Sequence, residues 1–142
     1  MFLVDVNVLL YAYWEGAEDH AAYRSWIQSV LSSDEAYGIS ELVLSSFVRI
    51  ATSPRVFTPP ATLREALTFV EKVRERPNAV TVSPGPRHWE IFRRLCTAAG
   101  AKGNLVADAY LAALAVESGS EWVTTDRDFS RFPGLRTRHP LR

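Results

Sequence analysis

The sequence predicts an α/β fold in which a central, mostly parallel sheet of four or five strands is flanked by helices. Short apolar runs of strand length alternate with longer segments of helical periodicity along the whole chain. Strands that are separated by helices pair in parallel, because the helix carries the chain back to the start of the sheet. The length of 142 residues and the hydrophobic fraction of 47% suit one core, so we expect a single domain over residues 1–142.

The first part of the chain predicts one buried strand, a short helix and a longer helix. Residues 2–4 form an apolar run that is typical of a strand inside a parallel sheet. A short helix is expected over residues 6–14 and a longer one over residues 18–33, for which Asp19 is a candidate N-cap. The longer helix carries an apolar stripe, which consists of Tyr23, Trp26, Ile27, Val30 and Leu31.

The middle of the chain predicts a second strand and two further helices. The strand covers residues 35–40, and the next helix begins at Ser40 and ends before Pro54. The residues TLRE at 62–65 match a capping box at the start of a helix that Pro77 ends. The inward positions expected in that helix are Leu63, Ala66, Leu67, Val70 and Val73.

The last part of the chain predicts a pair of helices between strands. Proline is favoured in the first turn of a helix and glycine just after the last turn, and both residues occur at such places here. The expected elements are a strand at 79–82, a helix from Pro86 to Gly100, a helix from Asn104 to Gly119, a strand at 121–125 and a frayed strand at 135–139.

Composition narrows the class of protein. No apolar run reaches the length of a membrane span, and the apolar N-terminus contains Asp5 and lacks a basic leader, so we expect a cytoplasmic protein without membrane contact. A single cysteine, Cys96, excludes an internal disulfide and suits a reducing compartment. The net charge is zero, and although nearly all basic residues are arginines, a solvated surface explains them as well as a phosphate-binding one does.

Acidic residues follow three of the predicted strands. Asp5 ends the first strand, Glu41 lies in the first helical turn after the second, and Asp126 and Asp128 follow the fourth. Because the carboxyl ends of parallel strands share one edge of the sheet, these acids are expected at the edge where such sheets bind ligands. Each acid also has a structural explanation, as a helix cap, a favourable charge at a helix N-terminus or a turn former.

Asp108 has a less ordinary setting. It is the only charged residue between Leu105 and Val116, and its apolar neighbours three and four positions away place it on a helix face that is expected to be buried. Aspartate is rarely buried without a partner, and no lysine or arginine is adjacent. Asp108 therefore either joins the acids at the sheet edge or forms a structural ion pair with a distant arginine such as Arg49.

A convergence of Asp5, Glu41, Asp108 and Asp126 would form a metal site. Carboxylates that lie close together raise one another's pKa, so they do not all stay ionised without a cation. The set offers oxygen ligands only, with no histidine or cysteine at zinc-like spacing. These donors favour Mg²⁺, with Mn²⁺ as a substitute. Such a site suits phosphodiester hydrolysis by a metal-activated water.

Four segments, in this order, resemble the PIN-domain nucleases, and in particular the VapC-type toxins of bacterial toxin–antitoxin pairs. They are FLVDVNVLLYA at 2–12, SELVLSSFVRIATSPRVF at 40–57, GNLVADAYLAALAVESG at 103–119 and WVTTDRDFSRFPGL at 122–135. The resemblance implies a PIN-like three-layer fold and Mg²⁺-dependent endoribonuclease activity on single-stranded RNA. It also implies a homodimer and inhibition by a cognate VapB-type antitoxin.

The resemblance also implies roles for individual residues. Asp5 and Asp108 match the principal metal ligands of the family, and Asp126 matches a further acid of the same pocket. Asn7 matches a polar residue that supports the first aspartate or a metal-bound water. Asp128 is a substitute for Asp126.

Glu41 matches the second acidic element of the family, but its position in the helix differs from that of the acid in some relatives. In some relatives this acid lies about one helical turn nearer the arginine, where this sequence has Leu44. We expect Glu41 to act on the site from the start of its helix, through a bridging water.

Two other classes of function fit parts of the pattern. A receiver-like phosphotransfer module also places an aspartate at a strand end, but the segment DVN lacks a second aspartate and no glycine-rich phosphate loop is present. A catalytically inactive binding module with a PIN fold is the non-enzymatic alternative, against which the retained acids argue. The stripe that contains Tyr23, Trp26 and Ile27 exceeds what we expect a small α/β core to bury, which favours a homodimer interface there.

Overall fold

The computed structural model describes residues 1–142, and its five short strands form one sheet with the order β3-β2-β1-β4-β5. All four neighbouring pairs of strands are parallel. The α/β class, the parallel sheet and the fifth strand are therefore confirmed. The strands are β1 (Phe2–Val4), β2 (Tyr37–Ile39), β3 (Ala79–Thr81), β4 (Glu121–Val123) and β5 (Thr137–Arg138).

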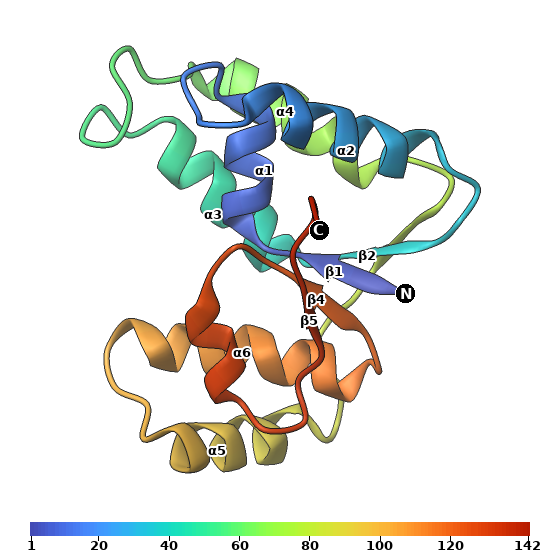
Figure 1. The fold of residues 1–142 in the computed structure, drawn as a ribbon, viewed down its shortest axis with the longest axis vertical. Helices are drawn as coiled ribbons and strands as arrows, with labels where there is room; N and C mark the ends of the chain where they lie inside the picture. Colours follow the sequence, from blue (N-terminus) through green and yellow to red (C-terminus); the bar gives the residue numbers. More distant parts are fainter.

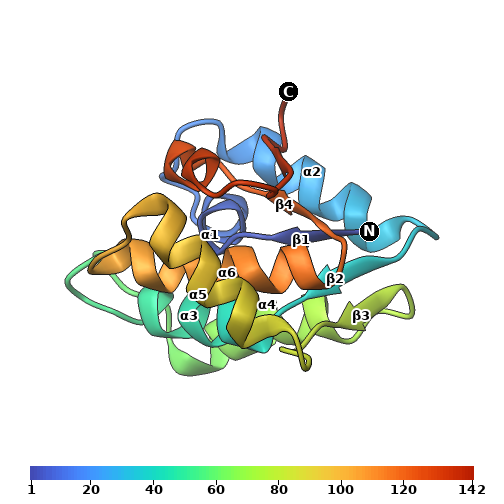
Figure 2. The ribbon, with the colours of Figure 1, turned by 90° about the horizontal axis from the view of Figure 1, so that it is seen from below.

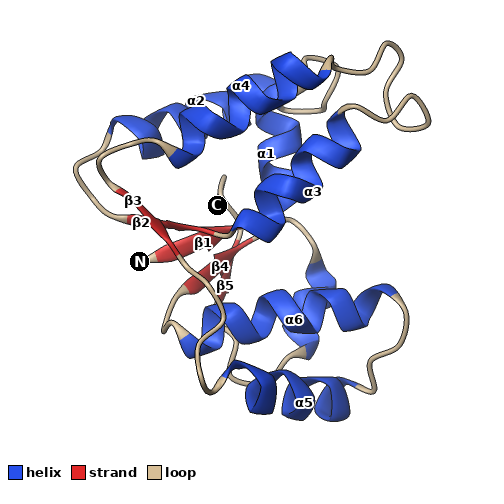
Figure 3. Cartoon of the chain, turned by 180° about the vertical axis from the view of Figure 1, so that it is seen from behind, coloured by secondary structure: helices blue, strands red, loops and turns tan.

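Helices cover both faces of this sheet and form a three-layer molecule (Figure 1). The helices α1 to α4 lie on one face, and α5 and α6 lie on the other (Figure 3). No helix combines the length and the apolar character that crossing a bilayer requires. The helices are α1 (Val6–Tyr13), α2 (His20–Ser32), α3 (Glu41–Ala51), α4 (Leu63–Arg74), α5 (His88–Ala99), α6 (Asn104–Glu117) and a short 3-10 helix, η1 (Arg127–Arg131).

The handedness of the crossovers explains this division of the helices. The connections from β1 to β2 and from β2 to β3 move in one direction across the sheet, and they contain α1 to α4. The connection from β3 to β4 returns in the other direction, so a right-handed crossover puts α5 and α6 on the opposite face. The direction reverses between β1 and β4. In open parallel sheets this reversal point, at the carboxyl ends of the strands, is where ligands bind.

The predicted apolar stripe of α2 lies inside the molecule. Tyr23, Ile27 and Val30 are buried, and the half-buried ring of Trp26 packs against Phe2 with 5.9 Å between the ring centroids. They belong to, or pack against, one continuous cluster of 28 buried hydrophobic residues. The chain thus covers Tyr23, Ile27 and Val30 with its own sheet and helices, and the stripe is not in excess of the core at these positions; Trp26 and Leu31 stay half-buried, and a homodimer contact there stays a prediction.

Local signals at the helix ends predicted some caps and missed others. Thr62 and Glu65 form the predicted capping box, with reciprocal hydrogen bonds of 3.1 and 2.9 Å. Asp19 precedes α2 but adopts a left-handed backbone conformation, with φ of 58°, and its side chain caps nothing. Asn104 is the first residue of α6 rather than its cap, since Gly103 occupies the cap position.

Two of the five positions of α4 that were predicted to face inward face solvent instead. Ala66, Val70 and Val73 are buried as predicted, but Leu63 is 60% exposed and Leu67 is also exposed. Periodicity alone made all five positions equivalent. The helix packs closely only along the line that faces α3 and β3, so apolar residues beside that line remain in contact with water.

Candidate active site

Asp5 lies at the point where the sheet changes direction. It directly follows β1 and precedes α1, and it is only 4% exposed. Its backbone N–H donates a 2.9 Å hydrogen bond to the carbonyl of Val123 in β4, which continues the sheet pairing by one residue. The fold therefore holds this carboxylate at the carboxyl edge of two central strands, as the sequence predicted.

Thr124 holds the Asp5 carboxylate in place. The register pairs Val4 with Val123, so the next residues of the two strands, Asp5 and Thr124, lie side by side. The buried Thr124 hydroxyl donates a 2.6 Å hydrogen bond to Asp5 Oδ2. Sequence reasoning missed this residue. The signal was a hydroxyl side chain at the end of a strand, two residues before an acid, but its importance depends on a register that only the structure gives.

The same hydroxyl links Asp5 to the loop that follows β4. Thr124 Oγ1 accepts a 3.0 Å hydrogen bond from the Asp126 backbone N–H, and Asp126 Oδ1 accepts one of 2.9 Å from the Asp128 N–H at the start of η1. One oxygen of the Asp126 carboxylate thus caps the N-terminus of η1. The structural explanation of Asp126, as a residue that forms a turn, is therefore correct. Its carboxylate also lies close enough for its charge to raise the pKa values of Asp5 and Asp108.

Asp108 is brought to this edge from the opposite face of the sheet. It lies one turn into α6 and is half-buried. Burial makes the largest contribution to the raised pKa of Asp108. The negative charges of Asp126, Asp5 and Asp128 add to it, and the pKa is about 6. The three ion pairs of the structure do not include Asp108. The alternative of a structural ion pair with Arg49 is therefore wrong, and the charges that act on Asp108 are those of three other aspartates.

The pKa of the Asp5 carboxyl group is raised by some of its surroundings and lowered by others. Burial is the largest and raises its pKa, and the charge of Asp126 adds to this effect. The Thr124 hydroxyl and the backbone N–H groups of Val6 and Asn7 lower the pKa, but they do not cancel the effect of burial. Neither N–H forms a hydrogen bond of capping geometry. Asn7 therefore faces the Asp5 carboxylate through its backbone, at the N-terminus of α1, where the helix dipole favours negative charge.

Glu41 stands apart from these aspartates. It is exposed at the start of α3, where its Oε2 lies 3.0 Å from Arg74 of α4 in an ion pair. Its charge is not among those that raise the pKa of Asp5 or Asp108. The structure thus brings Asp5, Asp108, Asp126 and Asp128 together and leaves Glu41 with a partner of its own. Action of Glu41 through a bridging water stays a prediction.

The donors at this edge suit a hard divalent cation in their chemistry. They are carboxylate oxygens, and the pKa values of Asp5 and Asp108 are raised by burial and then by neighbouring negative charge, which a cation would offset. No three histidine, cysteine, aspartate or glutamate side chains lie close enough together to enclose an ion. Mg²⁺ does not require such a cage, because it keeps several waters and is usually bound by one or two carboxylates together with phosphate oxygens of the substrate.

Comparison with known proteins agrees with this geometry. The chain matches the PIN domain over residues 2–135. It is 43% identical over 141 residues to ribonuclease VapC43 of Mycobacterium tuberculosis, with 99% of this chain and 96% of that protein covered. Ribonuclease VapC25 of the same organism is 42% identical over 140 residues, with 99% of both chains covered. These matches favour the nuclease over the receiver-like alternative.

Solved structures show the same fold at lower sequence identity. VapBC2 of Rickettsia felis, solved with a DNA fragment from its promoter, superposes with a TM-score of 0.70 at 17% identity and covers 97% of each chain. VapC20 of Mycobacterium tuberculosis, described as a sarcin-ricin loop cleaving toxin, gives a TM-score of 0.65 at 17% identity, with 96% of this chain and 99% of that chain covered. The chain therefore belongs to the PIN-domain family, among its VapC ribonucleases.

Proposed function

We propose that this protein is the toxin of a toxin–antitoxin pair and cleaves single-stranded RNA with a divalent cation, Mg²⁺ or Mn²⁺, at the site of Asp5, Asp108 and Asp126, through one or two of these carboxylates together with phosphate oxygens of the substrate. The observation that carries this proposal is the gathering of these aspartates at the reversal point of the sheet, where burial, and then the charges of neighbouring aspartates, raise the pKa of Asp108 to about 6. Uncompensated negative charge at the reversal point of a parallel sheet is a feature of functional sites rather than of stable cores.

The side chains of this protein have separate tasks in the reaction. Thr124 fixes one oxygen of Asp5, and the Asp128 N–H fixes one oxygen of Asp126, so both carboxylates are oriented before substrate arrives. Asp108 takes up a proton as the pH falls through about 6, unless positive charge offsets its neighbours. A Mg²⁺ ion bound to these carboxylates would supply Lewis acidity and an acidified water as the nucleophile for phosphodiester hydrolysis.

Water rather than the ribose 2′-hydroxyl is the expected nucleophile. The groups that act on Asp5 and Asp108 are other aspartates and hydrogen-bond donors, with no histidine or lysine among them to deprotonate a 2′-hydroxyl. The products should then carry a 5′-phosphate and a 3′-hydroxyl. End labelling of the fragments tests this proposal, and 2′,3′-cyclic phosphates or full cleavage in EDTA would contradict it. Asp5→Asn should abolish cleavage, whereas Glu41→Gln should reduce it less.

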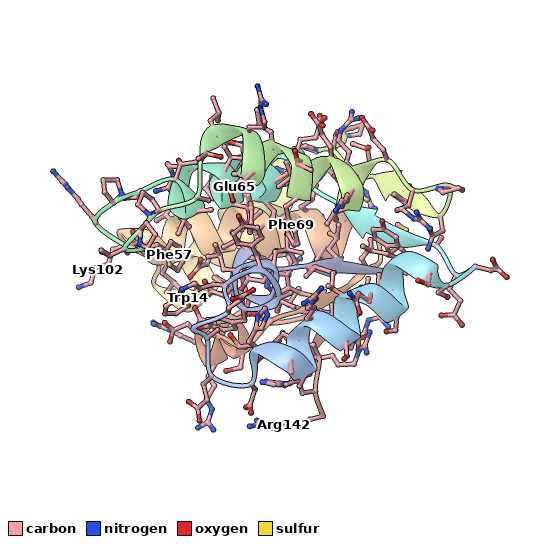
Figure 4. The ribbon with its side chains drawn as sticks, turned by 90° about the horizontal axis from the view of Figure 1, so that it is seen from above. Trp14, Phe57, Glu65, Phe69, Lys102 and Arg142 are labelled. Carbon is pink, nitrogen blue, oxygen red and sulfur yellow. The ribbon has the colours of Figure 1, made fainter.

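We propose that the antitoxin, a VapB-type protein, docks on an apolar groove next to α1. The groove has a volume of about 210 Å³ and is bordered by Trp14 and Phe57, whose rings lie edge to face at 5.0 Å. Trp14 is 44% exposed, and Figure 4 shows the two rings together beside Glu65. Several solved neighbours are complexes of VapB with VapC, which supports a partner of this kind.

A basic side chain of the antitoxin is expected to reach the aspartates and compete with the cation. Inhibition should then weaken as the Mg²⁺ concentration rises. If inhibition is unchanged over a wide range of Mg²⁺, direct competition is wrong and steric blockage explains the inhibition instead.

We also propose a homodimer. Because most of the α2 stripe is buried, the contact is expected to use more exposed apolar residues, and Trp89 on α5 is the most exposed large one, at 64%. It stacks at a tilt against Phe92, with 5.3 Å between the ring centroids, so two aromatic side chains would contribute to the interface. Light scattering at tens of micromolar tests this proposal, and a strict monomer would contradict it.

A further inference from the structure

A second pocket, wholly polar, adjoins the aspartates. It has a volume of about 280 Å³, and no hydrophobic residue lines it. Thr124 and Asp126 form part of its wall, so it shares two residues with the site described above. The remaining wall comes from η1, β5 and the carboxyl-terminal segment, which Figure 2 shows between the 3-10 helix and α2.

The charge of this pocket is opposite to that of the neighbouring site. Its lining contains three arginines and one acid, Asp126. Arg138 is compensated, because its Nε lies 2.8 Å from Glu121 and its guanidinium stacks over an aromatic ring. Arg127 and Arg142 are exposed and take part in none of the three ion pairs. Two guanidinium groups are therefore free to bind an anion next to the aspartates.

His139 positions one of these arginines without adding charge. Burial and the charge of Arg142 both lower the pKa of His139, so its ring is neutral at pH 7. Nδ1 of this neutral ring accepts a 3.2 Å hydrogen bond from the Leu141 N–H, which holds the chain just before Arg142. Arg142 lies near Tyr23 of α2 as well: burial raises the pKa of Tyr23, and the charge of Arg142 offsets part of this effect. Figure 4 shows Arg142 beside α2.

We propose that this pocket binds a backbone phosphate of the RNA strand adjacent to the cleaved linkage, through Arg127 and Arg142. The proposal rests on the proposed ribonuclease function. Guanidinium groups bind phosphate oxygens in a bidentate geometry, and the pocket adds the hydroxyl groups of Ser130 and Thr137 as donors. No hydrophobic residue lines the pocket, and its guanidinium and hydroxyl donors match the oxygens of a phosphate. The pocket therefore reads the backbone and not the sequence.

The test measures RNA affinity separately from cleavage. Arg127→Gln, Arg142→Gln and the double variant are prepared in a cleavage-deficient Asp108→Asn background, and binding of a short fluorescein-labelled single-stranded RNA of mixed sequence is followed by anisotropy in Mg²⁺. Each single change should weaken binding about tenfold. Each should also reduce the slope of log K against log salt by about 0.7, and the double variant by about twice that. Arg64→Gln on α4, an exposed arginine without a partner in the structure, is the matched control and should change neither quantity.

The outcomes separate this proposal from the function on which it rests. If the arginine variants bind RNA like their parent, with the same salt slope, the phosphate subsite is wrong even when the wild type cleaves RNA. If the wild type cleaves no RNA but the arginine variants lose affinity as expected, the subsite stands and the nuclease proposal fails. If the variants keep RNA affinity and lose affinity for the antitoxin, the pocket serves partner recognition and the subsite proposal is overturned.

Discussion

Replacing Asp108 with asparagine is expected to stabilise the metal-free protein at neutral pH. At pH 7 the wild-type Asp108 must ionise beside three other aspartates and in a half-buried position, which costs free energy in the folded state and not in the unfolded chain. Asparagine has nearly the same shape and carries no charge. A substitution in a catalytic site is thus expected to raise the melting temperature while it abolishes activity.

The size of the effect follows from the pKa of Asp108. Folding raises the pKa from 3.8 to about 6, and a fully transmitted shift of this size would correspond to about 3 kcal/mol. Asp108 is only half-buried, so solvent screening reduces the effect to about 1 to 2 kcal/mol. For a chain of this length the melting temperature should rise by roughly 3 to 6 °C. Because the folded state binds the proton more tightly, wild-type stability falls as pH rises from about 4 through about 6.

Thermal unfolding in EDTA measures this difference at two pH values. The gain of Asp108→Asn should be present at pH 7, should fall to about a third at pH 4.5, and should disappear only below the unfolded pKa of 3.8, where Asp108 is protonated in both states. Glu41→Gln is the control, since it removes a carboxylate that has an ion-pair partner in Arg74; it should be neutral or cost up to about 1 kcal/mol. A loss of several kcal/mol for Asp108→Asn in EDTA at pH 7 would refute this reasoning, because only the loss of a buried partner produces it.

Four further outcomes are expected. Thr124→Val removes the donor to Asp5 Oδ2 and should weaken Mg²⁺ binding, measured by calorimetry, about tenfold or more; unchanged affinity would show that the hydroxyl does not position Asp5. At subsaturating Mg²⁺, cleavage should decline as pH falls through about 6, because protons compete with the cation at Asp108, and a flat profile between about pH 7 and pH 5 would contradict this. Trp14→Ala should weaken antitoxin binding at least about tenfold in a titration while RNA cleavage is kept, and equal affinity would remove the proposed groove. Trp89→Ser should shift the dimer to monomer in light scattering, and an unchanged mass would place the interface elsewhere.

The backbone arrangement could be predicted from the sequence because it depends on local signals and a few general rules. The alternation of strand-length apolar runs with helices predicted a parallel sheet, and the carboxyl ends of parallel strands lie at one edge of the sheet. This placed Asp5 and Asp126 correctly before their distance was known. Asp108 was placed by the cost of burying an unpaired carboxylate, which is again a local property of its helix.

Features that depend on the register of distant segments could not be predicted. Thr124 matters because β1 and β4 pair so that it lies next to Asp5, and no pattern within either strand shows this. Glu41 follows a strand as the other acids do, but the packing of α3 against α4 gives it Arg74 as a partner. The α2 stripe was assigned to an interface because its burial by segments far away in the sequence was not visible.

Binding of Mn²⁺, followed by the loss of its free electron paramagnetic resonance signal, tests the central claim most directly. The wild type should bind Mn²⁺ at a saturable site from which Mg²⁺ displaces it. Asp5→Asn and Asp108→Asn should each lose this site while their circular dichroism stays that of a folded protein, and Glu41→Gln should keep it. If the wild type binds no Mn²⁺ at millimolar concentration, or if the two aspartate variants bind it as tightly as the wild type, these aspartates do not hold the cation.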